Sequence, residues 1–138
     1  MSGVSHVPRE TYEFTKHIPF SEHLGIKVDS LEKGVARLSM MIRPEFMTSW
    51  GTAHGGSILA LLDITLSMAV RTLYDPPRSV MTIDLSTQFI GTTTGLLRAE
   101  GRVMKAGQST IFCEGEARDE KGELVAKAIG TFRARSPK

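Results

Sequence analysis

Several residue types are scarce in this chain, and each scarcity excludes a class of protein. Cys113 is the only cysteine among 138 residues, which excludes an internal disulfide framework and a cysteine-based metal site. It falls in an alternating apolar stretch and is expected to be a small core residue. The formal net charge is only +2, from 17 basic and 15 acidic side chains. Because these charges are dispersed, no nucleic-acid partner is expected.

Long apolar runs are missing as well. The longest one, residues 58–70, is shorter than the ~20 residues that a membrane span needs, and it contains Asp63. The first residues, MSGVSHVPRETYEF, lack the apolar core of a signal peptide. We therefore expect a soluble, cytoplasmic protein without a membrane partner.

The motifs of several common functional sites are also absent. There is no G-x-S-x-G elbow, which excludes the serine chemistry of α/β-hydrolases. The glycine patterns of dinucleotide-binding and P-loop proteins are missing too. His6, His17 and His23 have no companion ligands at metal spacing, so no metal is expected.

What remains is an ordinary globular composition, with 41% apolar and 23% charged residues. The length predicts one domain over residues 1–138, with residues 1–24 as a lead-in segment. Residues 35–43 alternate apolar and polar side chains, as a half-buried strand does. Glu32, Lys33 and Gly34 before them predict a hairpin turn, with residues 26–31 as the partner strand.

The middle of the chain predicts one helix, and the second half predicts strands. Residues 54–73 carry apolar side chains on nearly every side of a helical projection, which predicts a helix buried all round. Pro76 and Pro77 end it. Turn-like segments separate four further strands at residues 79–90, 96–105, 109–118 and 123–135. The order predicts an α+β fold, an antiparallel six-stranded sheet around one central helix. One helix cannot cover six strands, so another subunit is expected to bury the rest.

Asp63 is the first candidate for chemistry. It lies among leucines and isoleucines in the most apolar segment of the chain. An unpaired buried carboxylate costs several kcal/mol, so this one must be paired, neutralised or placed in a wet pocket. A structural carboxylate that pairs with an arginine or caps a loop is one interpretation, and a general base is the other.

The segment His54-Gly55-Gly56 directly precedes the helix. Helix-start N–H groups lack partners and lie at the positive end of the helix dipole, where they suit an oxyanion or a polarised carbonyl. Gly55 and Asp63 are eight residues apart, which is about 12 Å along a helix. If both act on one substrate, the aspartate must come from a second subunit, and the site lies at a dimer interface.

The pattern G-x-x-H-G-G, followed by an apolar helix with Asp63 nine residues after His54, resembles the hotdog-fold acyl-CoA thioesterases of the phenylacetic acid degradation type. The segment VMTIDL at residues 80–85 matches as well, with Thr82 two residues before an acid. The resemblance implies hydrolysis of an acyl-CoA to a carboxylic acid and CoA by a homodimer at least, and by the family's habit a homotetramer. It implies no cofactor, since coenzyme A is part of the substrate.

The resemblance also implies roles for particular residues. Asp63 corresponds to the general base or nucleophile, and the Gly55 N–H to the donor that polarises the thioester carbonyl. His54 frames that turn. Thr82 positions water or the carboxylate from the opposing subunit. The residues expected to contact the CoA portion are Lys105, Gly107, Gln108 and Ser109.

One position departs from the family pattern. Thr48 stands where many relatives have an asparagine that helps to hold the thioester or the water. A threonine hydroxyl is shorter and lacks the donors and the carbonyl of an amide. The alternative is therefore a non-catalytic, regulatory acyl-CoA-binding hotdog domain, which Thr48 favours and which Asp63 and Thr82 disfavour. A hydratase of the same fold is a third possibility, but its Asp/His pairing is not evident.

Overall fold

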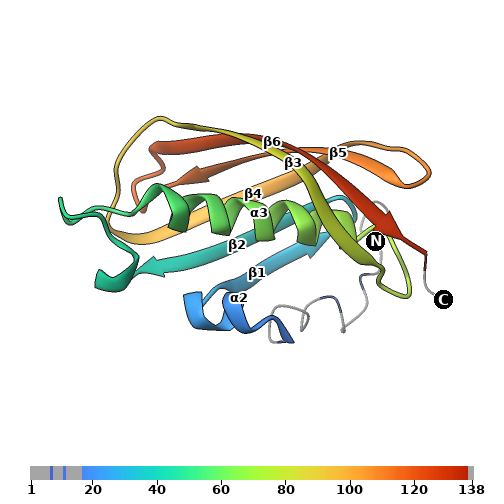
Figure 1. The fold of residues 1–138 in the computed structure, drawn as a ribbon, viewed down its shortest axis with the longest axis horizontal. Helices are drawn as coiled ribbons and strands as arrows, with labels where there is room; N and C mark the ends of the chain where they lie inside the picture. Colours follow the sequence, from blue (N-terminus) through green and yellow to red (C-terminus); the bar gives the residue numbers. More distant parts are fainter. Residues whose placement is uncertain (1–6, 8–10, 12–16, 137–138) are drawn as a thin grey trace.

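The computed structural model describes residue 7, residue 11 and residues 17–136, which form an α+β fold (Figure 1). Among the described helices, none is long and apolar enough to cross a membrane. The elements in chain order are α2 (Pro19–Leu24), β1 (Lys27–Glu32), β2 (Val35–Ile42), the 3₁₀ helix η2 (Pro44–Phe46), α3 (Gly55–Arg71), β3 (Ser79–Phe89), β4 (Gly95–Ala106), β5 (Thr110–Arg118) and β6 (Leu124–Arg135).

The strands form one antiparallel sheet of six strands in the order β1-β2-β4-β5-β6-β3. This confirms the predicted sheet and helix. The hairpins β1–β2, β4–β5 and β5–β6 join neighbours along the chain, as the turn-like segments predicted. β3 instead pairs with β6, so it forms an edge of the sheet although it follows α3 directly.

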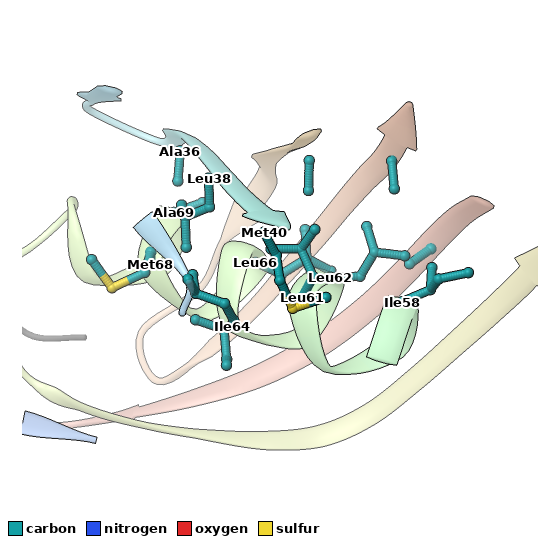
Figure 2. Close-up of a cluster of buried hydrophobic side chains, with 14 of the residues drawn as sticks. Ala36, Leu38, Met40, Ile58, Leu61, Leu62, Ile64, Leu66, Met68 and Ala69 are labelled. Carbon is teal, nitrogen blue, oxygen red and sulfur yellow. The ribbon is translucent and has the colours of Figure 1, made fainter. Parts of the chain in front are cut away.

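The core lies between α3 and the face of the sheet that curves around it (Figure 1). Alternate residues of each strand point toward the helix, as the period of two requires. In β2 these are Ala36, Leu38 and Met40, which pack near the side chains of α3 (Figure 2). Cys113 on β5 is fully buried in the same core, which confirms its predicted role. Burial raises the pKa of its thiol to about 12, so this thiol stays protonated at neutral pH.

Leu66 of α3 packs into a hollow that three glycines leave in the sheet. A Cβ atom added to Gly101 would lie 2.7 Å from Leu66 Cδ2, and one added to Gly115 would lie 2.8 Å from the same atom. These two glycines pair directly across β4 and β5. At Gly130 on β6, a Cβ would lie 3.2 Å from Leu66 Cδ1. The hollow therefore fixes how close α3 lies to the sheet and how it is rotated about its axis.

One side of α3 is left without full cover. Gly56 is exposed there, and Ala60, Asp63 and Ser67 are only half-buried. Their spacing of four, three and four residues places them on one side of the helix. We call these four residues the uncovered strip. The prediction of a helix buried all round is therefore wrong for the single chain, because the curved sheet covers most of α3 but leaves this strip.

We expect Gly101→Ala to destabilise the fold by about 1–3 kcal/mol, because the added methyl group overlaps Leu66 Cδ2. Urea unfolding followed by circular dichroism measures the change. In a Leu66→Ala background the overlapping atom is gone, so the same glycine substitution should cost less. Equal costs in both backgrounds would contradict the packing of Leu66 into this hollow.

Candidate active site

The start of α3 presents a backbone N–H group for which the described part of the chain supplies no acceptor. His54 caps the helix, since its Nδ1 accepts a hydrogen bond from the Gly56 N–H at 2.8 Å. The His54 carbonyl accepts from the N–H groups of Ser57 and Ile58. Among the described residues, no acceptor takes the N–H of Gly55. This group lies at the positive end of the helix dipole and suits a carbonyl oxygen or an oxyanion.

Asp63 lies in the middle of α3, on the uncovered strip, and it has a partner in its own chain. The Thr82 hydroxyl on β3 donates a hydrogen bond from Oγ1 to Asp63 Oδ1 at 2.6 Å. The carboxylate is thus paired and half-buried rather than sealed in an apolar core. Thr82 reaches the carboxylate of its own chain, whereas the resemblance implied water or the carboxylate of the opposing subunit. A carboxylate has about four acceptor sites, so Asp63 keeps acceptor capacity beyond this bond.

A β-bulge between Thr82 and Asp84 determines which side chains of β3 face the helix. Thr82 pairs with Phe132, which is fully buried, and the register then shifts by one residue at Ile83. After the shift, Leu85 is half-buried and Asp84 is exposed. Strict alternation would have turned Asp84 toward α3 together with Thr82. The bulge therefore keeps the hydroxyl on the helix side and a second carboxylate away from Asp63.

The charge of Asp63 acts on Arg71, two turns further along α3. Burial lowers the pKa of the Arg71 guanidinium to about 10, and the negative charge of Asp63 acts in the opposite direction. A group with a pKa of about 10 is still a cation at neutral pH. Arg71 is therefore a buried positive charge on the same helix as Asp63.

Thr48 lies in the loop between η2 and α3, and its hydroxyl holds a turn. Its Oγ1 accepts a hydrogen bond from the Trp50 N–H at 3.2 Å and lies 3.4 Å from Thr52 Oγ1. Gly51 closes the turn in the left-handed region, with φ of 79°, and donates its N–H to the Thr48 carbonyl. Thr48 thus has a local structural role, and its contact with a thioester stays a prediction.

The residues expected to contact the CoA portion lie together at the β4–β5 turn. Lys105, Gly107, Gln108 and Ser109 are all exposed there. The Gly107 N–H donates to the Thr110 carbonyl at 2.8 Å and closes the turn. In Figure 1 this orange turn and the start of α3 lie at opposite ends of the molecule. Within one chain, the predicted CoA contacts and the free N–H group are therefore apart.

A separate hollow of about 590 Å³ lies on the face of the sheet away from α3. Charged side chains of β2, β4 and β5 line it, among them Arg37, Glu100 and Arg118. Arg37 and Glu100 form an ion pair at 2.8 Å, and exposed pairs of this kind contribute little to stability. The hollow includes neither Asp63 nor Gly55. In the described part of the chain, no cluster of His, Cys, Asp or Glu could hold a metal ion.

One chain therefore holds two separate halves of the candidate site. His54 and Gly55 lie at the start of α3, and Asp63 with Thr82 lies near its middle. The helix rise separates the Gly55 and Asp63 backbones by about 12 Å. The arrangement offers a backbone hydrogen-bond donor in one place and a carboxylate in the other.

Phe89 lies next to the candidate site, although no sequence pattern had pointed to this residue. A Cβ atom added to Gly55 would lie 3.5, 3.6 and 3.9 Å from three carbons of the Phe89 ring. An aromatic residue seven positions after Thr82 in the same strand was visible in the sequence. Its position beside Gly55 was not, because that depends on how β3 crosses α3.

Known sequences place the chain among relatives that cover most of its length. Residues 51–126 match the thioesterase superfamily. A Saccharolobus solfataricus protein provisionally named an esterase, SSO2140, is 36% identical over 120 residues, which cover 86% of this chain and 85% of that protein. The medium/long-chain acyl-CoA thioesterase YigI of Escherichia coli is 26% identical over 135 residues, covering 86% of this chain and 87% of YigI.

Solved structures show the same architecture. The conserved protein PA5202 from Pseudomonas aeruginosa superposes with a TM-score of 0.82 at 29% identity, covering 92% of this chain and 98% of that one. A thioesterase family protein from Silicibacter pomeroyi superposes with a TM-score of 0.88 at 20% identity, covering 94% and 98%; this second likeness shows the fold alone. The sheet wrapped around one long helix is the hotdog fold, and the chain belongs to the thioesterase superfamily.

Proposed function

We propose that this protein hydrolyses acyl-CoA thioesters to a carboxylic acid and CoA. The observation that carries the proposal is the 2.6 Å hydrogen bond from Thr82 to the half-buried Asp63, on the same helix that begins with the free Gly55 N–H. The acyl-CoA thioesterase activity in the name of YigI supports the substrate class. Membership of the phenylacetic acid degradation type stays a prediction from the sequence.

Asp63 is the group that starts the reaction in this proposal. As a general base it takes a proton from water while the water oxygen attacks the thioester carbon, and CoA then leaves as the thiolate. As a nucleophile it attacks the same carbon itself, and water later hydrolyses the resulting anhydride. Thr82 engages Oδ1 and restrains the carboxylate, which leaves Oδ2 for either task. The geometry of one chain fits both routes.

The Gly55 N–H polarises the thioester carbonyl and holds the oxyanion that forms on attack. A fixed donor in a place where negative charge develops stabilises the transition state more than the ground state. The helix dipole adds to this effect at the first turn of α3. No metal or redox cofactor is needed for this chemistry, since CoA enters as part of the substrate.

The complete site lies between two copies of the chain. Gly55 and Asp63 are too far apart along α3 to contact one thioester, so each site takes Gly55 from one copy and Asp63 from the other. Two features support such a pairing. β3 is an edge strand of 11 residues with exposed Met81 and Ile83, and an unpaired apolar edge is normally covered. The uncovered strip of α3 offers small side chains on which a second, antiparallel helix can lie closely.

The same pairing brings the expected CoA contacts toward the site. In an antiparallel pair, the β4–β5 turn of one copy comes to the same end as the start of the other copy's α3. Lys105 in that turn is an exposed cation, which suits the phosphates of CoA. We also propose that two such dimers form a tetramer, as the sequence resemblance implies.

The first prediction from this proposal concerns the carboxylate. Asp63→Asn keeps the shape of the side chain and its bond with Thr82, but it removes the base. We expect kcat for thiol release from the best acyl-CoA to fall by about 10²–10⁴-fold. The melting temperature should change little, since Asp63 is half-buried and not sealed in the core. Asp84→Asn, on the exposed side of β3, is the matched control and should keep kcat.

An Asp63→Asn variant with near wild-type kcat would contradict the catalytic role. A wild-type protein that binds acyl-CoAs but releases no free thiol across a panel of acyl groups would contradict hydrolysis itself. That second outcome would favour the acyl-CoA-binding regulatory domain.

The second prediction concerns the N–H at the start of α3. Proline is well tolerated at the first position of a helix, and His54 before it has the extended conformation that a following proline needs (φ −66°, ψ 140°). Gly55→Pro should therefore keep the helix while deleting one donor, and kcat should fall by about 10²–10³-fold. Gly55→Ala keeps the N–H but adds a side chain. A comparison of the two variants therefore distinguishes loss of the hydrogen-bond donor from loss of space. An active Gly55→Pro enzyme would show that this N–H does not hold the oxyanion.

The third prediction concerns sharing of the site. Asp63→Asn and Gly55→Pro proteins are each expected to be nearly inactive, and mixing them under subunit exchange should restore activity. Statistical mixing in a two-fold dimer gives about a quarter of the wild-type sites. Native mass spectrometry should follow the exchange, and light scattering should give a mass above the 15.1 kDa of one chain. Proven exchange without recovered activity, or an active monomer, would place the whole site in one chain.

A further inference from the structure

One edge strand contacts both halves of the candidate site. β3 brings Thr82 to Asp63 near the middle of α3, and it brings Phe89 to Gly55 at the start of α3. Figure 1 shows β3 crossing α3, with its end toward the start of the helix. The same strand that holds the carboxylate therefore also places an aromatic ring beside the carbonyl-binding N–H.

The environment of the Phe89 ring is unusual for a side chain on the core side of a sheet. Its Cα partner Ala126 on β6 is fully buried, yet Phe89 itself is 52% exposed. The next residue, Ile90, is also 52% exposed. The Phe89 ring thus lies beside Gly55 at the end of β3 and is half exposed. Covering apolar surface of this size is favourable in proportion to the area removed from water.

The ring of Phe89 fits one part of an acyl-CoA better than the other. A phenyl ring has no hydrogen-bond donor or acceptor for the two amides of the pantetheine arm, and burying an amide without partners is costly. An acyl chain has no polar group beyond its carbonyl. The ring therefore suits the acyl side of a thioester whose carbonyl oxygen is bound at Gly55.

We propose that Phe89 is a specificity-determining residue whose ring forms one wall of the acyl-binding site. The inference rests on the proposed thioesterase function and names its substrate class: acyl-CoAs whose acyl group is apolar and longer than acetyl. Gly55 fixes the carbonyl, and the chain beyond it lies against the exposed part of the Phe89 ring.

The experiment compares Phe89→Ala and wild-type enzyme on acetyl-, hexanoyl- and decanoyl-CoA by thiol release. Removal of the ring should lower kcat/KM for decanoyl-CoA by about tenfold or more, mainly through KM. The loss should shrink with acyl length and be smallest for acetyl-CoA. Phe89→Leu, which keeps an apolar side chain, should lie between the two. The inhibition constant of free CoA should be the same in the variant and the wild type, because CoA carries no acyl group.

The matched control is Phe112→Ala. Phe112 is 42% exposed on β5, but it points away from α3, because its neighbours Ile111 and Cys113 are fully buried on the helix side. This substitution should leave the acyl-length profile as in wild type.

Three outcomes would overturn the inference. An unchanged profile in Phe89→Ala, with wild-type enzyme active, would remove Phe89 from the acyl site and leave the proposed function standing. Equal losses on all three substrates, with weaker inhibition by CoA, would place the ring at the pantetheine arm. A wild-type enzyme that releases no thiol from any acyl-CoA would overturn the proposed function and this inference together.

Discussion

The contact between Leu66 and the three glycines of the sheet determines where every other group of the site lies. Because Gly101, Gly115 and Gly130 leave room for one leucine, α3 lies close to the sheet in one rotation about its axis. That rotation buries Leu62 and Leu66 and leaves Asp63 half-buried on the adjoining side of the helix. The Asp63 carboxylate is therefore accessible because Leu66, on the same helix, packs closely against the glycines of the sheet.

The edge position of β3 completes this arrangement. A strand in the middle of the sheet would have neighbours on both sides, which would pair its backbone N–H and C=O groups. At the edge, β3 can lie against α3 with Thr82 turned toward Asp63 by the bulge at Ile83. The exposed apolar residues along it are a cost for a single chain. A second copy that covers the edge and the uncovered strip would remove this cost and complete the site in one step.

Much of this fold was predictable, because its elements carry local signals. The alternation of residues 35–43 and the prolines after the helix place these two elements close to the observed β2 (Val35–Ile42) and α3 (Gly55–Arg71). The position of β3 at the far edge was not predictable, since pairing with β6 depends on contacts between distant segments. The bulge at Ile83 leaves no composition signal either. The partial exposure of Asp63 follows from the glycine hollow, and the turn-holding bond of Thr48 follows from loop geometry, so neither could be derived from the pattern of apolar residues.

Gly55 and Gly56, the two adjacent glycines at the start of α3, differ in whether neighbouring atoms leave room for a side chain. A Cβ atom at Gly56 would lie 3.1 Å from His54 Nδ1, so a side chain there would press on the helix cap. At Gly55, a Cβ would meet only ring carbons of Phe89 at 3.5 Å or more, which is ordinary van der Waals contact. Neither glycine has a positive φ. The chain itself therefore explains the absence of a side chain at Gly56 but gives no reason for it at Gly55. Glycine permits close approach to a backbone N–H, which agrees with the proposed binding of a thioester carbonyl at Gly55.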